Sequence, residues 1–150
     1  MATKLNPYVN IRGGLAREAL EFYRSVFGGE VMVMTFGEFG GEGRIADLVM
    51  HGQLITETGR KLMVADAPEE IVQITVGDNV SIAIDGEAED AERLRGIFAA
   101  LASDGGRIEN PLLIAPWGDE FGSVVDRYEI HWMLNIAGTE PEEPFPAVED

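Results

Sequence analysis

Two histidines are the side chains of this chain best suited to proton transfer, because an imidazole titrates near neutral pH, at a pKa of about 6.5. They are His51, in the segment VMHGQLI, and His131, in the segment EIHWMLN. Gln53 lies two residues after His51 and shares one face with it if this segment is a β-strand. We take His51 as the candidate catalytic base, although hydrogen bonding of a ligand is the simpler use of the same imidazole.

The same side chains allow an alternative, a metal site. His51, Gln53 and His131 could bind a divalent ion, with Asp47 at the edge of the strand. The sequence lacks a closely spaced ligand pair such as HExxH, however, and two histidines so far apart are ordinarily pocket-lining or half-buried side chains. We therefore expect no cofactor and no resident metal, with a divalent metal as the alternative.

Both tryptophans lie in one segment, WGDEFGSVVDRYEIHWMLN. Its pattern predicts two strands joined by a turn, with Trp132 in the core, because large aromatic side chains are mostly buried. His131, Met133 and Asn135 then lie on the opposite face of the last strand. Trp117 begins the glycine-containing WGDEFG turn and is a candidate to cap an apolar ligand.

The elements that position these residues occur twice in the same order. A strand in KLNPYVNIR precedes a helix in LAREALEFYRSVFGGE, which a glycine pair ends, and three strands follow. After a loop, NVSIAID is again a strand, EDAERLRGIFAALASDGG is again a helix that ends on a glycine pair, and three strand candidates follow. This repeat predicts an α+β fold of two βαβββ modules, about residues 5–66 and 78–136, in one domain of residues 1–137.

Each helix should cover the more apolar face of its sheet. The residues assigned to the helix side are Val9, Ile11, Leu48, Met50, Leu54, Val80, Ile82 and Ile84. The other faces should curl around a cavity between the modules, since ligand sites favour such clefts. The residues assigned to that cavity are Tyr8, Asn10, Val49, His51, Gln53, Ile55, Met63, Ala65, Ser81, Ala83, His131, Met133 and Asn135.

The charge of the chain argues against several kinds of partner. Its 27 acidic and 11 basic residues give a formal net charge of -16, which repels nucleic acid and anionic lipid. The chain has no cysteine and no apolar run long enough to cross a bilayer. We therefore expect a cytoplasmic protein with no nucleic-acid or membrane partner. Residues 138–150 are an acidic, proline-rich tail whose composition argues against packing as a helix or strand.

Five blocks of the sequence resemble successive blocks of a known family. They are NPYVNIRGGLAREALEFYRSVFGGE, VMHGQLI, LMVADAP, NVSIAID and WGDEFGSVVDRYEIHWMLN. In this order they resemble the PhnB-like branch of the glyoxalase, bleomycin resistance and dioxygenase superfamily, also called vicinal oxygen chelate proteins. The resemblance covers residues 5–136. It implies paired βαβββ modules, a homodimer, and a cavity in which the enzymes hold a divalent metal that chelates vicinal oxygens of the substrate.

The metal-ligand positions that the resemblance implies hold unsuitable side chains here. They fall on Tyr8 and Ser81 in the first strands of the modules and on Met63 and Met133 in the last strands. A thioether prefers soft ions and a neutral hydroxyl binds hard cations weakly, so we do not expect the usual metal. Members of the branch are often described as demethylubiquinone methyltransferases. The sequence lacks the glycine-rich turn and acidic strand end that a cofactor such as S-adenosylmethionine normally needs, so we expect no methyltransferase.

One further departure from the family lies in the last turn. Glu129 occupies a position where the resemblance implies glycine, which predicts a different turn between the last two strands.

Two functions remain open at this point. The first is a PhnB-like protein, expected as a homodimer, that binds a small apolar or aromatic ligand without the usual metal. Its binding residues would be Tyr8, Asn10, His51, Gln53, Met63, Ser81, Trp117, His131, Met133 and Asn135. The alternative is a metal-dependent enzyme of the same superfamily, a lyase, isomerase or extradiol-type dioxygenase, in which an ion polarises the substrate oxygens. A purely structural module has no feature of the sequence in its favour.

Overall fold

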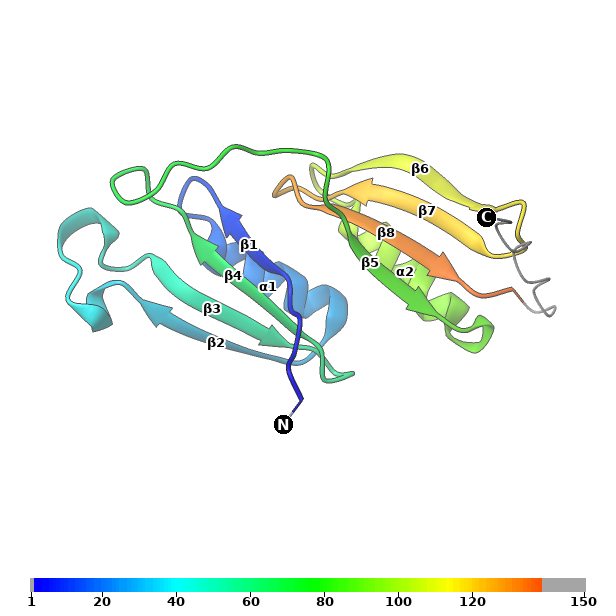
Figure 1. Cartoon of the computed structure of the whole chain (residues 1–150), viewed down its shortest axis with the longest axis horizontal. Helices are drawn as coiled ribbons and strands as arrows, with labels where there is room; N and C mark the ends of the chain where they lie inside the picture. The colour runs from blue at the N-terminus through cyan, green and yellow to red at the C-terminus, as the bar shows by residue number, and fades with distance from the viewer. Residues whose placement is uncertain (1, 139–150) are drawn as a thin grey trace, which may run out of the picture. The chain divides into compact units, whose positions relative to one another are not determined.

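A computed structural model describes residues 2–138 of the chain. The chain forms two compact units, and the boundary between them falls between Gly77 and Asp78. We call them unit 1 and unit 2 and describe each by itself (Figure 1). Apart from Gly138, the acidic tail expected at residues 138–150 lies outside the described residues. Among residues 2–138, no helix is both long and apolar enough to cross a membrane.

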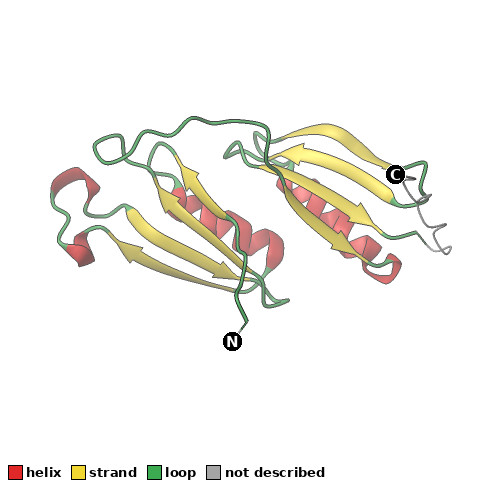
Figure 2. Cartoon of the chain, viewed as in Figure 1, coloured by secondary structure: helices red, strands yellow, loops and turns green. Residues whose placement is uncertain are grey.

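Unit 1 is a four-stranded mixed sheet with one helix on one face (Figure 2). Its main elements are β1 (Tyr8–Ile11), α1 (Ala16–Phe27), β2 (Glu30–Thr35), β3 (Val49–Ile55) and β4 (Lys61–Asp66), with 3-10 turns at Gly37–Phe39 and Gly43–Ile45. The strand order is β1-β4-β3-β2; β1 is parallel to β4 and the other pairs are antiparallel.

Unit 2 repeats this arrangement. Its elements are β5 (Ile82–Gly86), a 3-10 turn (Ala88–Asp90), α2 (Ala91–Leu101), β6 (Arg107–Ile114), β7 (Glu120–Val125) and β8 (His131–Ile136). The strand order is β5-β8-β7-β6, and β5 is parallel to β8. The α+β class and the two βαβββ modules expected from the sequence are therefore confirmed.

The core of each unit lies between its helix and its sheet. In unit 1 the fully buried side chains include Leu20 and Tyr23 of α1 and Leu54 and Val64 of the sheet. The residues that fill this layer in unit 2 are Leu94, Ile97, Phe98, Leu101, Val124, Trp132 and Leu134. Trp132 is 4% exposed, which confirms its expected place in the core. A buried aromatic side chain of this size contributes about 3–5 kcal/mol to stability when compared with alanine.

Matching hydrogen bonds relate positions in the two units. The Ala67 amide donates to the Ile11 carbonyl (3.0 Å), and the Ala137 amide donates to the Gly86 carbonyl (2.9 Å). Ile11 and Gly86 are therefore equivalent, as are Ala67 and Ala137. Counting back along the strands makes Met63 equivalent to Met133, and their parallel partners Tyr8 and Ala83 equivalent to one another.

This correspondence corrects one sequence expectation. Ser81 was expected as the partner position of Tyr8, but it lies before β5 begins, and Ala83 is the residue that pairs with Met133. Val80, expected beneath the helix, is 75% exposed because it also precedes the strand. The start of β5 cannot be read from alternation, since the apolar and polar residues continue to alternate outside the paired segment.

A second correction concerns Val49. It was expected on the cavity side with His51, but it is fully buried, and its Cγ1 atom lies 3.2 Å from the position a Cβ at Gly52 would take on the helix side. The cause is a β-bulge: Met34 pairs with His51 while the next residue, Thr35, pairs with Val49. Met50 is thus an extra residue, and the bulge moves Val49 to the other face.

Buried carboxylates join the elements of each unit. Asp66 accepts hydrogen bonds from the amides of Ala16 (3.0 Å) and Val49 (2.8 Å), and so links the start of α1 to β3 and β4. In unit 2 Asp126 accepts from the amide of Tyr128 (2.8 Å) and from the indole of Trp132 (2.8 Å). The role of Asp66 could not be inferred from sequence spacing, because its donors lie far away along the chain, whereas the donors to Asp126 all lie in the turn and strand that follow it.

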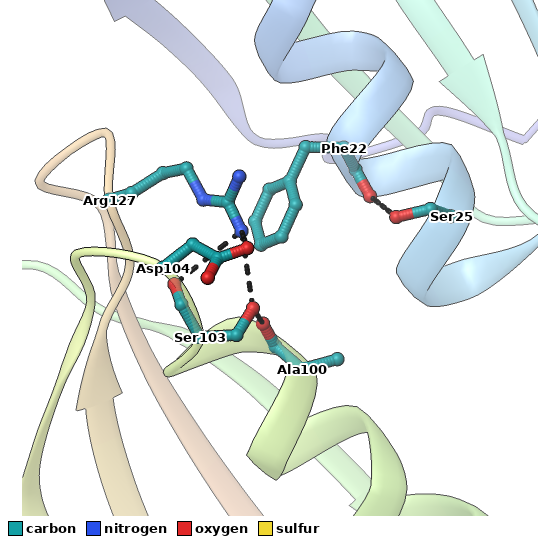
Figure 3. A network of polar contacts seen from close by, with 6 residues as sticks. All are labelled: Phe22, Ser25, Ala100, Ser103, Asp104 and Arg127. Atoms are coloured by element: carbon teal, nitrogen blue, oxygen red, sulfur yellow. Dashed lines mark hydrogen bonds and ion pairs between the residues drawn. The ribbon is translucent and has the colours of Figure 1, made fainter.

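A polar network fixes the end of α2 in unit 2 (Figure 3). The Arg127 guanidinium donates to the Ser103 hydroxyl (3.1 Å) and lies 3.4 Å from the Asp104 carboxylate. The Ser103 hydroxyl in turn donates to the carbonyl of Ala100 (2.6 Å). Figure 3 also shows the hydrogen bond from Ser25 to the Phe22 carbonyl, which lies within α1 of unit 1. The Arg127 contacts thus link the turn before β8 to the residues that follow α2.

Candidate functional site

The sheet face opposite α1, which we call the open face of unit 1, carries five of the expected site residues. They are Tyr8, Asn10, His51, Gln53 and Met63. The strand register places Tyr8 beside Met63 and Met63 beside Gln53, so these three side chains form one row across β1, β4 and β3. The sheet itself therefore brings together residues that are more than 50 positions apart.

His51 lies next to this row. Its ring centroid is 5.8 Å from that of Tyr8, with the two planes inclined by 38°. Tyr8 is 46% exposed, so its ring offers a surface on which a second aromatic group could pack. At this separation the imidazole has an apolar neighbour on one side, and its nitrogen atoms remain available for a ligand.

The polar side chains of this face differ from most buried polar groups in having no partner among the described residues. Among residues 2–138, no side-chain hydrogen bond forms at Tyr8, Asn10, His51 or Gln53. A hydroxyl, two carboxamides and an imidazole thus offer both donors and acceptors. An unsatisfied polar group that a ligand covers is costly unless the ligand pairs with it, so such groups favour a ligand with matching polar atoms.

Two methionines extend the open face of unit 1 and were not predicted as site residues. Met32 pairs with Gln53 and so extends the row of Tyr8, Met63 and Gln53 onto β2. Met34 pairs with His51, next to that row. Met32 is 47% exposed. The alternation of EVMVMT carried this signal, since it places Met32 and Met34 on one side of a strand. Flexible thioethers adapt to irregular apolar ligands and pack favourably on aromatic rings.

The open face of unit 2, defined as the face opposite α2, carries three expected site residues. His131, Met133 and Asn135 alternate along β8 with the buried Trp132 and Leu134. They pair with Val125, Ser123 and Phe121 of β7 respectively. The orientation expected for these three residues is thus observed.

The polar groups of unit 2's open face are partnered, in contrast to those of unit 1. The Asn135 carboxamide donates to Asp119 (2.9 Å), and the Asn110 carboxamide bonds the Ser123 hydroxyl (2.7 Å). His131 Nδ1 lies 3.9 Å from a Glu109 carboxylate oxygen. The two carboxamides and the Ser123 hydroxyl are thus hydrogen-bonded, whereas the His131–Glu109 separation is too long for a hydrogen bond. This face has fewer unused hydrogen-bonding groups to offer a ligand.

The two remaining expected site residues, Ser81 and Trp117, lie outside the strands that form the open faces. Ser81 is exposed and precedes β5. Trp117 lies in the turn between β6 and β7, is 44% exposed, and has its ring 6.1 Å from that of Phe121 in an edge-on arrangement. Trp117 is therefore connected to the open face of unit 2 through Phe121, whose strand partner is Asn135.

The residues at the family's metal-ligand positions do not fit a divalent metal. Tyr8 and Met63 are paired in unit 1, and their equivalents Ala83 and Met133 are paired in unit 2. Methyl, thioether and neutral phenol groups are poor ligands for hard cations. Within residues 2–138, no three His, Asp or Glu side chains gather closely enough to hold a metal. Asp47, considered as an extra ligand, precedes β3, and its backbone carbonyl accepts a hydrogen bond from Arg17.

Solved structures with the same architecture come from several bacteria. Protein PA1353 from Pseudomonas aeruginosa superposes with a TM-score of 0.78 at 27% identity, over 91% of this chain and 99% of its own. A PhnB protein from Bacillus cereus, named as a candidate 3-demethylubiquinone-9 3-methyltransferase, gives 0.66 at 26% identity, over 90% and 100% of the two chains. No protein-family model matches the sequence, and no curated protein matches it significantly.

A third structure carries the name of the superfamily. It is a glyoxalase/bleomycin resistance protein/dioxygenase family enzyme from Burkholderia phytofirmans, with a TM-score of 0.56 at 16% identity over 86% of this chain and 95% of its own. The chain therefore has the fold of the glyoxalase, bleomycin resistance and dioxygenase superfamily. Its similarity to the Bacillus cereus protein supports the PhnB-like branch within it.

Proposed function

We propose that this protein binds a small apolar or aromatic molecule on the open face of unit 1, without the metal that enzymes of the superfamily use. The observation that carries the proposal is the row of Tyr8, Met63 and Gln53 with His51 beside it. It combines an exposed aromatic ring, thioethers and unused hydrogen-bonding groups. Ligand pockets in proteins typically have this composition, mostly apolar with a few polar groups that fix orientation.

The ligand would be held by two kinds of contact. Its apolar body would pack against Tyr8, Met32 and Met63, and one or two polar atoms would bond His51 and Gln53. Asn10 is the next outward-facing residue along β1 and could contact a longer ligand. On unit 2, His131, Met133, Asn135 and Trp117 are retained as candidate ligand contacts.

The choice of a metal-free site rests on the chemistry of the side chains. Tyr8 and Met63 occupy the ligand positions that the resemblance to the enzymes implies, and they do not suit a hard cation. No step that depends on a metal is therefore assigned to this chain. In the alternative, a metal-dependent lyase, isomerase or dioxygenase, a divalent ion would have to be held by another set of residues.

A neutral fluorescent probe tests the proposal directly. N-phenyl-1-naphthylamine is apolar and aromatic, and its emission rises when it leaves water. We expect saturable binding to the wild-type protein. Replacing Tyr8 with alanine removes the exposed ring and should weaken binding by about tenfold, since an aromatic pair contributes about 0.5–1.5 kcal/mol beyond the burial of its area.

The matched control is Glu18→Gln, on the exposed side of α1 and away from the open face. It should bind the probe as the wild type does. Elemental analysis of the same preparation distinguishes the alternative function. Near-stoichiometric metal that is lost in His51→Ala would overturn the metal-free proposal and favour the enzyme.

We further propose that the protein is a homodimer and works in the cytoplasm. Both proposals follow from the resemblance and the composition of the chain. Light scattering coupled to size exclusion checks the first, and an eluting mass of one chain, 16.3 kDa, would refute it.

A further inference from the structure

Lys61 places a cation on the open face of unit 1. It is the first residue of β4, and it alternates with the buried Leu62 and Val64, as Met63 does. Its side chain therefore lies on the same side of the sheet as that of Met63, roughly 7 Å away along the strand. On its flexible four-carbon stem, the ammonium can reach a ligand that packs on Met63.

The Lys61 ammonium has no partner in the part of the chain that the structure describes. Among residues 2–138 it forms no ion pair and no hydrogen bond. The side chain is half-buried, so part of its stem is already covered. The chain has 27 acidic residues against 11 basic ones, and yet none of the described carboxylates pairs with this cation. The ammonium is therefore available to an anion that comes from outside the protein.

The charges around Lys61 leave this end of the open face positive. Its neighbour on β3, Ile55, is apolar, and Glu30 lies one strand further, on the outer edge strand β2. Two strand spacings amount to about 9.6 Å, so solvent and salt screen Glu30 from Lys61. Arg60, the preceding residue, also forms no ion pair among residues 2–138, and the carboxylate of Glu57 in the same hairpin lies at the end of α1.

Unit 2 shows a carboxylate at the equivalent place. The equivalence of the strands makes Lys61 correspond to His131, and each pairs with an apolar residue of the neighbouring strand. In unit 2 the Glu109 carboxylate lies 3.9 Å from Nδ1 of His131 and 3.4 Å from the guanidinium of Arg107. A carboxylate of the protein itself thus covers this end of the open face of unit 2.

Glu109 reaches that place because of an irregularity in β6. The register of β6 with β7 shifts between Ile108 and Asn110, and Glu109 is the residue at the shift. The register of β2 with β3 is unbroken from the start of β2 to Met34, so unit 1 has no extra residue there. In unit 1 the place beside Lys61 is therefore left for a carboxylate that a ligand supplies.

We propose that Lys61 selects an aromatic monocarboxylate as the ligand of the open face of unit 1. The Lys61 ammonium donates a charge-assisted hydrogen bond to the carboxylate, and the aromatic body packs on Met63 and Tyr8, which are paired in the sheet. A single charge suits the site, because one ammonium matches it while the net charge of -16 repels more highly charged anions. This inference rests on the proposed function, since it names the class of ligand for the same face.

Two fluorescent probes with the same rings test the inference. 8-Anilino-1-naphthalenesulfonate is N-phenyl-1-naphthylamine with one sulfonate added, and is therefore a singly charged anion. Lys61→Gln should weaken binding of the sulfonate about tenfold, as expected for loss of a charge-assisted hydrogen bond, and should leave binding of the naphthylamine unchanged within about twofold. Lys61→Arg keeps the charge and should retain most of the affinity for the sulfonate.

The matched control is Arg24→Gln, which removes the same charge from unit 1. Arg24 lies on α1, on the other side of the sheet, where it is ion-paired with Glu21. This variant should change neither affinity. Competition then tests the carboxylate itself: 2-naphthoate should displace the sulfonate from the wild type about tenfold more effectively than neutral 2-naphthamide, and this preference should disappear in Lys61→Gln.

The outcomes separate this inference from the proposed function. Sulfonate affinity that is unchanged in a folded Lys61→Gln protein, or lowered equally by Arg24→Gln, would overturn the inference. If naphthylamine binding still depends on Tyr8 in that case, the proposed function stands. Failure of the naphthylamine to bind the wild type would instead refute the proposed function.

Discussion

The last hairpin of each unit shows how differently the two units use one backbone. In unit 1 the Thr56 amide donates to the Arg60 carbonyl and the Gly59 amide donates to Thr56, both at 2.9 Å. In unit 2 Asp126, Ile130 and Glu129 make the same pair of bonds. The left-handed position is Gly59 in one turn (φ 81°) and Glu129 in the other (φ 68°). The two turns of this chain therefore share one conformation, and only the residue at the left-handed position differs.

The candidate ligand-binding surfaces also share their backbone geometry and differ in their side chains. Sheet order, parallel pairing and the hydrogen bond that closes the parallel pair are common to both units. The polar side chains on the open face of unit 1 have no hydrogen-bond partner among residues 2–138, whereas Asn110, Ser123 and Asn135 of unit 2 are partnered. Backbone geometry is thus repeated while the chemistry has diverged, as expected when function depends on side chains placed on a common fold.

The largest effect should come from the buried carboxylates. Asp126→Ala leaves the indole of Trp132 and two backbone amides without their acceptor, and we expect a loss of about 3–4 kcal/mol in the free energy of unfolding. Asp66→Ala removes two bonds and should cost about 2–3 kcal/mol. Urea unfolding measures both. A smaller loss for Asp126→Ala than for Asp66→Ala would contradict the inference that the loss of stability grows with the number of hydrogen bonds removed.

A second comparison uses glycines at equivalent sheet positions, Gly52 and Gly122. A Cβ at Gly52 would lie 2.4 Å from Leu20, and one at Gly122 would lie 2.9 Å from Phe98. Replacing either by alanine overpacks the helix against the sheet, so we expect each to destabilise the protein by about 1–3 kcal/mol. Gly96→Ala is the control: it lies in α2 with open space around it and should stabilise by about 0.5–1 kcal/mol.

The hairpin positions give a pair of reciprocal variants. Glu129→Gly should stabilise the protein by about 1 kcal/mol, because a left-handed conformation is unfavourable for a residue with a Cβ. Gly59→Glu should destabilise it by a similar amount for the same reason. Thermal unfolding detects both changes. If the two variants shifted the melting temperature in the same direction, the equivalence of the turns would be lost.

The smallest effect concerns the ion pair that joins α2 to β7. Arg95 Nε lies 3.1 Å from a Glu120 carboxylate oxygen, and this hydrogen bond, followed by the charge of Arg95, lowers the pKa of Glu120. The pair's contribution is therefore complete above the unfolded pKa of glutamate, about 4.3, and is lost as the pH falls through the lower folded pKa.

Arg95→Gln should accordingly lower the melting temperature slightly at neutral pH and lose this effect in acid. The melting temperatures of Arg95→Gln and wild type should therefore converge once the pH is below the pKa of Glu120 in both the folded and the unfolded protein. A difference that persisted there would show that packing of the arginine stem, and not its charge, is responsible.

Much of the fold could be predicted from the sequence, because periodicity reports which face of an element is buried. It correctly placed Trp132 on the core side of β8. It failed at Val49, because a bulge breaks the two-residue period and nothing in the local sequence marks the extra residue. It failed at Ser81 because a polar residue next to a strand resembles one inside it.

The candidate site was predictable only in part. His51 and Gln53 could be placed on one face from their spacing, but the row with Tyr8 and Met63 depends on strand register, which spacing along the chain does not give. The position of Tyr8 beside Met63 depends on the parallel pairing of β1 with β4, and a single sequence contains no direct record of it.

The central claim is that the open face of unit 1 binds the ligand. It is tested most directly by following the amide resonances of the protein during addition of N-phenyl-1-naphthylamine. We expect saturable shifts at Tyr8, His51, Gln53 and Met63, with Glu18 of α1 unmoved. Shifts confined to unit 2 or to the outer side of α1, or no binding at all, would contradict the account.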